Sequence, residues 1–166
     1  MRLVAYSNSS DAPPASVRID WAFDDGNAGA QGSGGALTAT GFSTVNITAV
    51  NDAPAGANKT VTTLEDTAYV LAAGDFGFTD LDDASAHALA AVKITTTPGA
   101  GSLTLDGVPV SAGQFISIAD ITAGKLRFLP DANENGSPYA TVGFQVSDGT
   151  AFSVAANTLT VTVTTV

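Results

Sequence analysis

Apolar and polar residues alternate along several short segments of this chain, a pattern typical of strands that bury one face. In the segment TVGFQVSDGT (141–150) the alternating apolar residues are Val142, Phe144 and Val146. The segment 158–166 alternates in the same way. No stretch of ten or more residues places apolar side chains at helical spacing. The pattern predicts an all-β protein.

An internal repeat organises the chain. The segment VRIDWAFDDGN (17–27) matches TVGFQVSDGT (141–150), because in both an alternating apolar run precedes Asp-Gly. The segment TVNITAV (44–50) matches TVTVTTV (160–166). We therefore expect three parts: residues 1–50 as the C-terminal part of a preceding repeat, 51–54 as a linker motif, and 55–166 as one complete repeat.

Turn-forming residues interrupt the complete repeat at short, regular intervals, as in a β-sandwich. Asp106-Gly107 is one such turn. The expected strands are 58–63, 68–76, 88–96, 102–110, 126–129, 140–147 and 158–166. A chain of this kind predicts an immunoglobulin-like Greek-key β-sandwich of about seven strands.

Five motifs follow one another through this repeat: VNDAP (50–54), LEDTAY (64–69), DFGFTDLDD (75–83), GSLTLDGVPV (101–110) and LRFLPDANENG (126–136). Together they resemble the cadherin-like tandem repeats of large bacterial surface proteins and adhesins. The resemblance implies a cadherin-like sandwich, an extracellular location at the bacterial cell surface, and neighbouring repeats of the same chain as partners. It also implies rods, often rigidified by Ca²⁺, that act in cell adhesion or biofilm attachment, with a receptor, a glycan or a like adhesin as a further partner.

Charge and composition narrow the possible partners. The net charge of -10 argues against binding to nucleic acid or to an anionic membrane surface. The chain has no cysteine, which excludes disulfides and thiolate metal sites. No apolar stretch approaches the roughly 20 residues of a membrane span, so we expect a protein that is not membrane-embedded.

Strand reversal in a sandwich is expected to gather the acidic loops at two ends. The end that carries the linker, called the linker pole below, collects Asn51, Asp52, Asp80, Asp82, Asp83 and Asp148. The opposite end, called the far pole, collects Glu65, Asp66, Asp131, Asn133 and Glu134. Ca²⁺ prefers such oxygen ligands, and neither set contains the histidine or cysteine that would favour zinc or copper. Both poles are therefore candidate calcium sites, although Asp, Asn and Gly are also ordinary turn residues.

The linker pole also resembles the junction between animal cadherin repeats. There a linker Asn-Asp before proline works with an Asp-x-Asp motif, which Asp80-Leu81-Asp82 matches here. An EF-hand at DANENG (131–136) is rejected, because its twelfth position would be Val142 instead of a bidentate glutamate.

No catalytic arrangement is expected. His87 is the sole histidine, and no G-x-S-x-G motif accompanies it, so we interpret it as an exposed loop residue. Trp21 alternates with apolar neighbours and is expected in a core, whereas Tyr139 could be a structural residue or a sugar platform. The predicted function is a calcium-binding extracellular repeat that acts as a rigid structural or adhesive module. The alternatives are a carbohydrate-binding or accessory module of a secreted enzyme, and a metal-free spacer.

Overall fold

The computed structural model describes residues 5–10, 12–26, 37–80 and 87–166. The chain divides into two compact units, Met1–Val50 and Asn51–Val166. This division falls at the start of the linker motif that the repeat predicts. Each unit is described by itself below.

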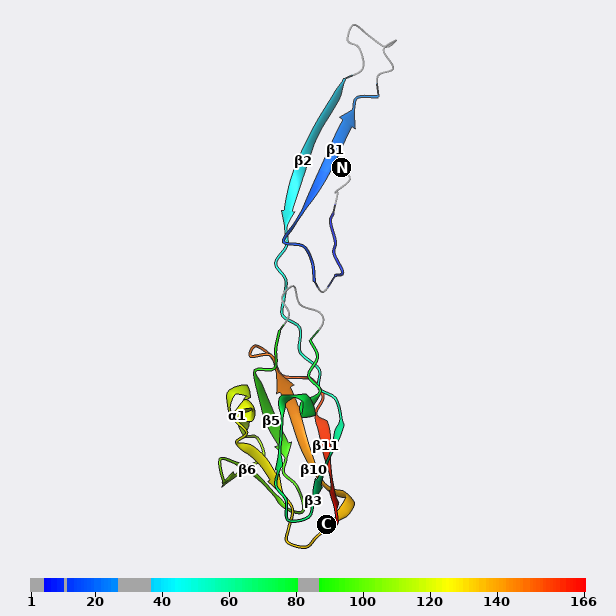
Figure 1. The fold of residues 1–166 in the computed structure, drawn as a ribbon. Coiled ribbons are helices and arrows are strands. Elements are labelled where there is room, and N and C mark those ends of the chain that lie inside the picture. The colour runs from blue at the N-terminus through cyan, green and yellow to red at the C-terminus, as the bar shows by residue number, and fades with distance from the viewer. Residues whose placement is uncertain (1–4, 11, 27–36, 81–86) are drawn as a thin grey trace. The chain divides into compact units, whose positions relative to one another are not determined.

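The first unit contains an antiparallel hairpin of β1 (Ser16–Asp24) and β2 (Thr38–Asn46), shown in Figure 1. Trp21 lies opposite Gly41, and its ring stacks at a tilt on Phe23 with the ring centroids 5.0 Å apart. The expectation that Trp21 lies in a core is wrong, since 38% of its surface is exposed. The described part of this unit has one two-stranded sheet, so no second layer covers the ring.

The register of this hairpin repeats in the second unit. Val17 lies opposite Val45 in β1 and β2, and the aligned pair Ala140 and Val161 lie opposite each other in β10 and β11. The next pairs agree as well: Ile19 with Ser43, and Val142 with Leu159. The internal repeat therefore extends from sequence to strand pairing.

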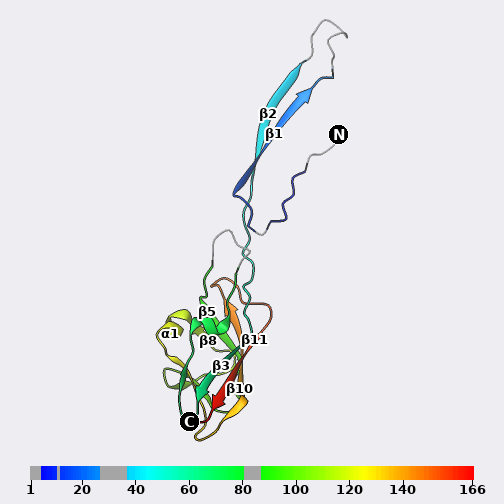
Figure 2. The ribbon, with the colours of Figure 1, turned by 45° about the vertical axis from the view of Figure 1, so that its right-hand side comes forward.

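The second unit is an all-β sandwich of two sheets. Five strands form one sheet in the order β3 (Lys59–Leu64), β11 (Asn157–Thr164), β10 (Gly136–Ser147), β5 (Ala91–Thr96) and β8 (Phe115–Ser117). Four strands form the other in the order β4 (Tyr69–Val70), β9 (Leu126–Leu129), β6 (Ser102–Leu105) and β7 (Val108–Pro109). β3 and β11 pair in parallel, whereas β10 pairs antiparallel with both β11 and β5. Figures 1 and 2 show β3, β11 and β10 side by side.

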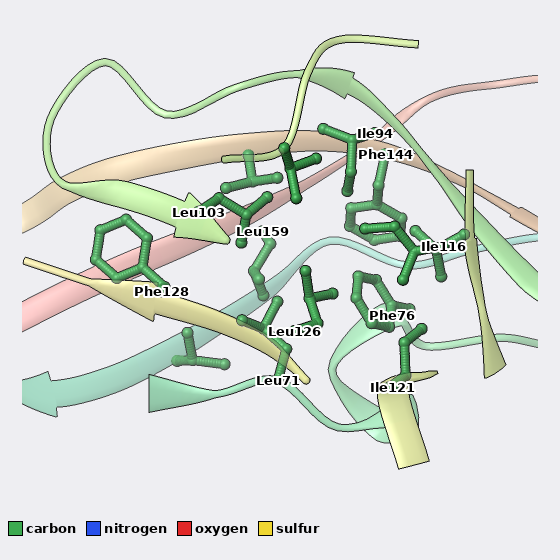
Figure 3. Packing of buried hydrophobic residues seen from close by; sticks show 14 of the residues in the cluster. Leu71, Phe76, Ile94, Leu103, Ile116, Ile121, Leu126, Phe128, Phe144 and Leu159 are labelled. Carbon is green, nitrogen blue, oxygen red and sulfur yellow. The ribbon is translucent and has the colours of Figure 1, made fainter. Parts of the chain in front are cut away.

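The core fills the space between these sheets (Figure 3). Phe76 and Phe144 meet edge to face with ring centroids 5.0 Å apart, and both are fully buried. Leu126 from the smaller sheet and Leu159 from the larger one are buried with them. The alternation of Val142, Phe144 and Val146 therefore marks the inward face of β10, as predicted.

The predicted strand at 68–76 is mostly wrong. Only Tyr69–Val70 is a strand, and Ala73–Phe76 forms the 3₁₀ helix η1. The carboxylate of Asp75 accepts hydrogen bonds from the backbone N–H of Ala72 at 2.8 Å and from the Tyr69 hydroxyl at 3.3 Å. These local bonds compete with a strand ladder.

Two further elements have no counterpart in the predicted strands. They are β8 and the short helix α1 (Ile118–Thr122), which lie between the predicted fourth and fifth strands. Ser117 caps α1, since its Oγ accepts a hydrogen bond from the backbone N–H of Asp120 at 3.1 Å. The predicted strand at 102–110 is a hairpin of β6 and β7 around Asp106-Gly107.

Candidate cation site at the linker pole

The linker pole is built where strands of the larger sheet end. β10 ends at Ser147, and Asp148 follows it directly. Oδ1 of Asp148 accepts hydrogen bonds from the backbone N–H groups of Thr150 at 2.6 Å and Ala151 at 2.7 Å. These bonds close a turn and fix the carboxylate, whose other oxygen, Oδ2, is left for contacts across the pole.

The environment of Asp148 favours its charged form. Burial alone would raise the pKa of this carboxyl group, but the hydrogen bonds from Ala151, Thr150 and Asn51, together with nearby His87, outweigh it. The pKa of Asp148 therefore lies below its ordinary value. A carboxylate that stays ionised is what a cation ligand requires.

The linker reaches the same point. Nδ2 of Asn51 donates a hydrogen bond to Oδ2 of Asp148 at 3.0 Å, across 97 positions of sequence. The predicted convergence of the linker with the loop after β10 is thus observed. Asp52, its neighbour, is exposed and does not join the cluster of ligand atoms described below.

Asp80 arrives from a third segment. An isolated bridge between Ala55 and Thr79 holds the chain before it, with reciprocal N–H to C=O hydrogen bonds of 2.8 Å. The side chain of Asp80 is only 2% exposed. Its Oδ2 atom is buried and accepts no hydrogen bond from the described part of the chain. Asp82 and Asp83, which were predicted beside it, lie outside the described residues.

His87 joins the two carboxylates, contrary to its interpretation as an exposed loop residue. Its Nδ1 atom lies 3.4 Å from Oδ2 of Asp80 and 3.7 Å from Oδ2 of Asp148, and its side chain is 28% exposed. The expectation that the poles lack histidine is therefore wrong for the linker pole. Strand direction could have revealed this, because β5 pairs antiparallel with β10. A residue shortly before β5 must lie near one that follows β10.

The three side chains form a compact donor set. One carboxylate oxygen of Asp80, one of Asp148 and one imidazole nitrogen of His87 lie within 4.8 Å of one another. Within the described residues this is the sole group of three such side chains close enough to share an ion.

The residues predicted at the far pole do gather at one end, but they hold turns together. Asn133 donates its backbone N–H to Asp66 Oδ1 at 3.0 Å. Oδ2 of Asp131 accepts from the backbone N–H of Gly101 at 2.8 Å. Glu65 Oε1 accepts from the backbone N–H of Val166 at 3.2 Å. These carboxylates are thus already engaged by the backbone.

Tyr139 completes the far pole. Its hydroxyl group lies 3.2 Å from both Asp131 Oδ2 and Glu134 Oε2 and accepts a hydrogen bond from the backbone N–H of Asp131 at 3.0 Å. Partial burial, together with the adjacent carboxylates, raises the pKa of Tyr139. Its ring packs edge to face against Phe128. These contacts favour the structural interpretation of Tyr139 over a sugar platform.

Comparisons with known proteins do not assign this chain to a family. No protein-family model, curated protein sequence or solved structure matches this chain. None of the described helices has the length and apolar character needed to cross a membrane. The functional conclusion therefore depends on the geometry of the linker pole.

Proposed function

We propose that this protein is a calcium-binding extracellular repeat that acts as a rigid structural or adhesive module of a large surface protein. The observation that carries the proposal is the hydrogen bond between Asn51 in the linker and Asp148 in the loop after β10. It joins the segment that enters the second unit to a buried carboxylate of that unit. A cation bound at this point would fix the direction in which the linker leaves the sandwich.

The chemistry of the pole supports calcium. The side chains of Asp80 and Asp148 are 2% and 0% exposed, so two carboxylates are held together away from water. Like charges at this spacing repel one another in a medium of low dielectric constant. A divalent cation reverses the sign of that interaction, and Ca²⁺ binds carboxylate, amide and water oxygens at 2.3–2.6 Å.

The role of such a module is mechanical and not catalytic. Rigid repeats placed in series would hold an adhesive end away from a bacterial cell surface, where it could reach a receptor, a glycan or a like adhesin. Neighbouring repeats of the same chain would be its direct partners. The matching register of β1–β2 and β10–β11 supports a tandem arrangement.

Thermal unfolding with and without calcium tests this proposal. Protein dialysed against EDTA should melt several degrees below protein in millimolar Ca²⁺, since a ligand that binds the folded state alone stabilises it. Asp80→Asn should remove most of this shift. Asp106→Asn, at an exposed turn residue that is not one of the clustered ligand residues, should keep it. An identical melting temperature in EDTA and in Ca²⁺ would favour the metal-free spacer.

One observation favours carbohydrate binding as a second candidate. Phe115 and Phe152 are 59% and 36% exposed, and their ring centroids lie 5.3 Å apart. Exposed rings of this kind can stack on sugars. Saturable glycan binding that Phe115→Ala abolishes would support this candidate, and an empty glycan array would remove it.

A further inference from the structure

We propose that the linker pole binds Zn²⁺ or a chemically similar transition-metal ion through Asp80 Oδ2, Asp148 Oδ2 and His87 Nδ1. The inference uses the pole of the proposed calcium function, but it depends on a nitrogen ligand that a calcium site does not need. Water would complete the coordination.

The spacing of the ligand atoms suits a small ion. Tetrahedral zinc with bonds of roughly 2.0–2.1 Å keeps its ligands about 3.3–3.4 Å apart. The two distances from His87 Nδ1 to the carboxylate oxygens are 3.4 Å and 3.7 Å. All three ligand atoms lie within 4.8 Å of one another, so side-chain rotations that draw them together would place them around one ion.

The buried Oδ2 atom of Asp80 is a second, independent observation that points to a bound cation. A carboxylate oxygen that is removed from water is normally hydrogen-bonded, since leaving it without a donor costs free energy. Oδ2 of Asp80 has no hydrogen-bond donor in the described part of the chain, although the side chain is only 2% exposed. It faces Nδ1 of His87 across 3.4 Å. A bound cation would offset the free-energy cost of burying this oxygen without a hydrogen-bond donor.

The imidazole decides which class of ion fits. Ca²⁺ and Mg²⁺ take oxygen ligands almost without exception, whereas histidine nitrogen suits Zn²⁺ and its neighbours in the first transition series. The absence of cysteine excludes thiolate ligands throughout the chain. Two carboxylates and one imidazole form a borderline donor set with three protein ligands, the number found in open zinc sites.

The surroundings orient the ligands in advance. Oδ1 of Asp148 is held by the backbone N–H groups of Thr150 and Ala151, so Oδ2 is directed toward the pole. Asn51 donates to that same Oδ2 at 3.0 Å and restricts its position further. Such outer contacts fix a metal ligand and raise affinity.

The two proposed metals, zinc and calcium, would share carboxylate ligands, and this predicts competition that can be measured. A zinc ion at Asp80 and Asp148 would occupy the oxygens that a calcium ion at this pole also needs. Binding of the two metals should therefore be mutually exclusive, and added Zn²⁺ should weaken the apparent affinity for Ca²⁺.

The test uses the full chain without a histidine tag, freed of metal and titrated with Zn²⁺ against a chromophoric chelator. We expect one ion per chain. His87→Ala should weaken zinc binding at least about tenfold, because changes to outer contacts alone already cost that much. The same variant should keep its calcium-dependent melting shift. Asp80→Asn should lose both responses, and Asp106→Asn should match the unaltered protein.

A spectroscopic measurement tests the identity of the nitrogen ligand. His87 is the sole histidine, so its two ring nitrogens give unambiguous ¹⁵N signals. Zinc should shift the Nδ1 signal strongly and leave Nε2 protonated. Far-ultraviolet circular dichroism of each variant before titration establishes that loss of binding is not loss of folding.

Three results would overturn the inference: no zinc binding, equal zinc binding by His87→Ala, or coordination through Nε2. The calcium proposal is judged separately by the EDTA melt. Zinc binding with no calcium response would support the inference and reject calcium, and the converse would reject the inference alone.

Discussion

Nδ2 of Asn51 donates a hydrogen bond to Oδ2 of Asp148 at 3.0 Å, although 97 positions separate the two residues. The bond connects the linker to the loop that follows β10, and its acceptor is a carboxylate whose own turn holds it in place. The orientation of the linker and the geometry of the pole are therefore coupled.

Removal of this hydrogen bond should lower both the stability of the second unit and its response to calcium. Asn51→Ala deletes the donor, and a hydrogen bond to a charged group contributes about 1.5–3 kcal/mol when it is well formed. Because Asn51 is half-buried, we expect a loss at the lower end of that range, measured by urea unfolding, together with a smaller calcium-induced melting shift. The exposed Asn135→Ala is the control and should leave both quantities unchanged.

Asp80→Asn should have opposite effects with and without metal. In EDTA the variant replaces a buried charged group by a neutral one, and the free energy of unfolding should rise by about 1–3 kcal/mol at pH 8. In calcium the unaltered protein should be the more stable of the two. Melting curves in both buffers check this, and a loss of stability in EDTA would contradict the account of Asp80.

Phe144 should be among the most costly core residues to truncate. It is fully buried and contacts Phe76 edge to face, so Phe144→Ala should lower the free energy of unfolding by about 3–5 kcal/mol. Phe115→Ala, at a position 59% exposed, should cost less than about 1 kcal/mol. Urea denaturation of the two variants measures the difference, and equal costs would disprove the assigned core.

Two separate constraints favour glycine at position 101: its backbone conformation and the lack of space for a side chain. Its φ is +68°, and a Cβ atom there would lie 2.7 Å from the carbonyl oxygen of Leu129. Gly107 also has positive φ, +81°, but open space around it. Gly101→Ala should therefore cost clearly more than Gly107→Ala, which carries only the backbone penalty of about 1 kcal/mol. Similar melting temperatures for the two variants would exclude the steric contribution.

Asp120 should titrate below its usual range. Hydrogen bonds from the Lys125 ammonium at 2.7 Å and from the Ser117 hydroxyl at 2.7 Å lower the pKa of this carboxyl group. Because the folded pKa is below the unfolded one, the stabilisation is complete above the unfolded pKa and is lost as the pH falls through the folded pKa.

Carbon-detected NMR titration of the Asp120 carboxyl group measures this. In Lys125→Met the pKa should move up toward its ordinary value, with a smaller upward shift in Ser117→Ala. An Asp120 pKa that does not respond to Lys125→Met would show that the ion pair is not maintained in solution.

Most of the sandwich could be predicted because alternation reports burial directly. Val142, Phe144 and Val146 lie inward as the pattern requires, and the strand 126–129 was placed without error. The two compact units meet between Val50 and Asn51, where the linker motif begins. Each of these features depends on side-chain periodicity over several residues.

The sequence pattern did not predict the short elements, because local side-chain hydrogen bonds determine where they form. Asp75 converts the end of a predicted strand into η1, and Ser117 starts a helix of five residues, too short to show a period. The prediction that Trp21 is buried was wrong for a different reason. Its strand alternates as predicted, but burial requires a second layer, and the described part of its unit has a single sheet.

The linker pole was predicted in part. Counting strand reversals brought Asn51, Asp80 and Asp148 together, and the structure agrees. The same counting applied to the residues before β5 would have included His87. A lone histidine carries no motif that marks it as a ligand, so its position beside Asp148 follows only from the antiparallel pairing of β5 with β10.

The parallel pairing of β3 with β11 determines how the second unit would respond to a pulling force. Force applied through the linker before β3 and through the end of β11 pulls these neighbours in opposite directions along their length. The six residue pairs from Lys59–Leu159 to Leu64–Thr164 are then loaded together in shear, and cannot unzip one at a time. Under such a load this edge of the sheet would resist as a unit, because its hydrogen bonds share the force and do not break in succession.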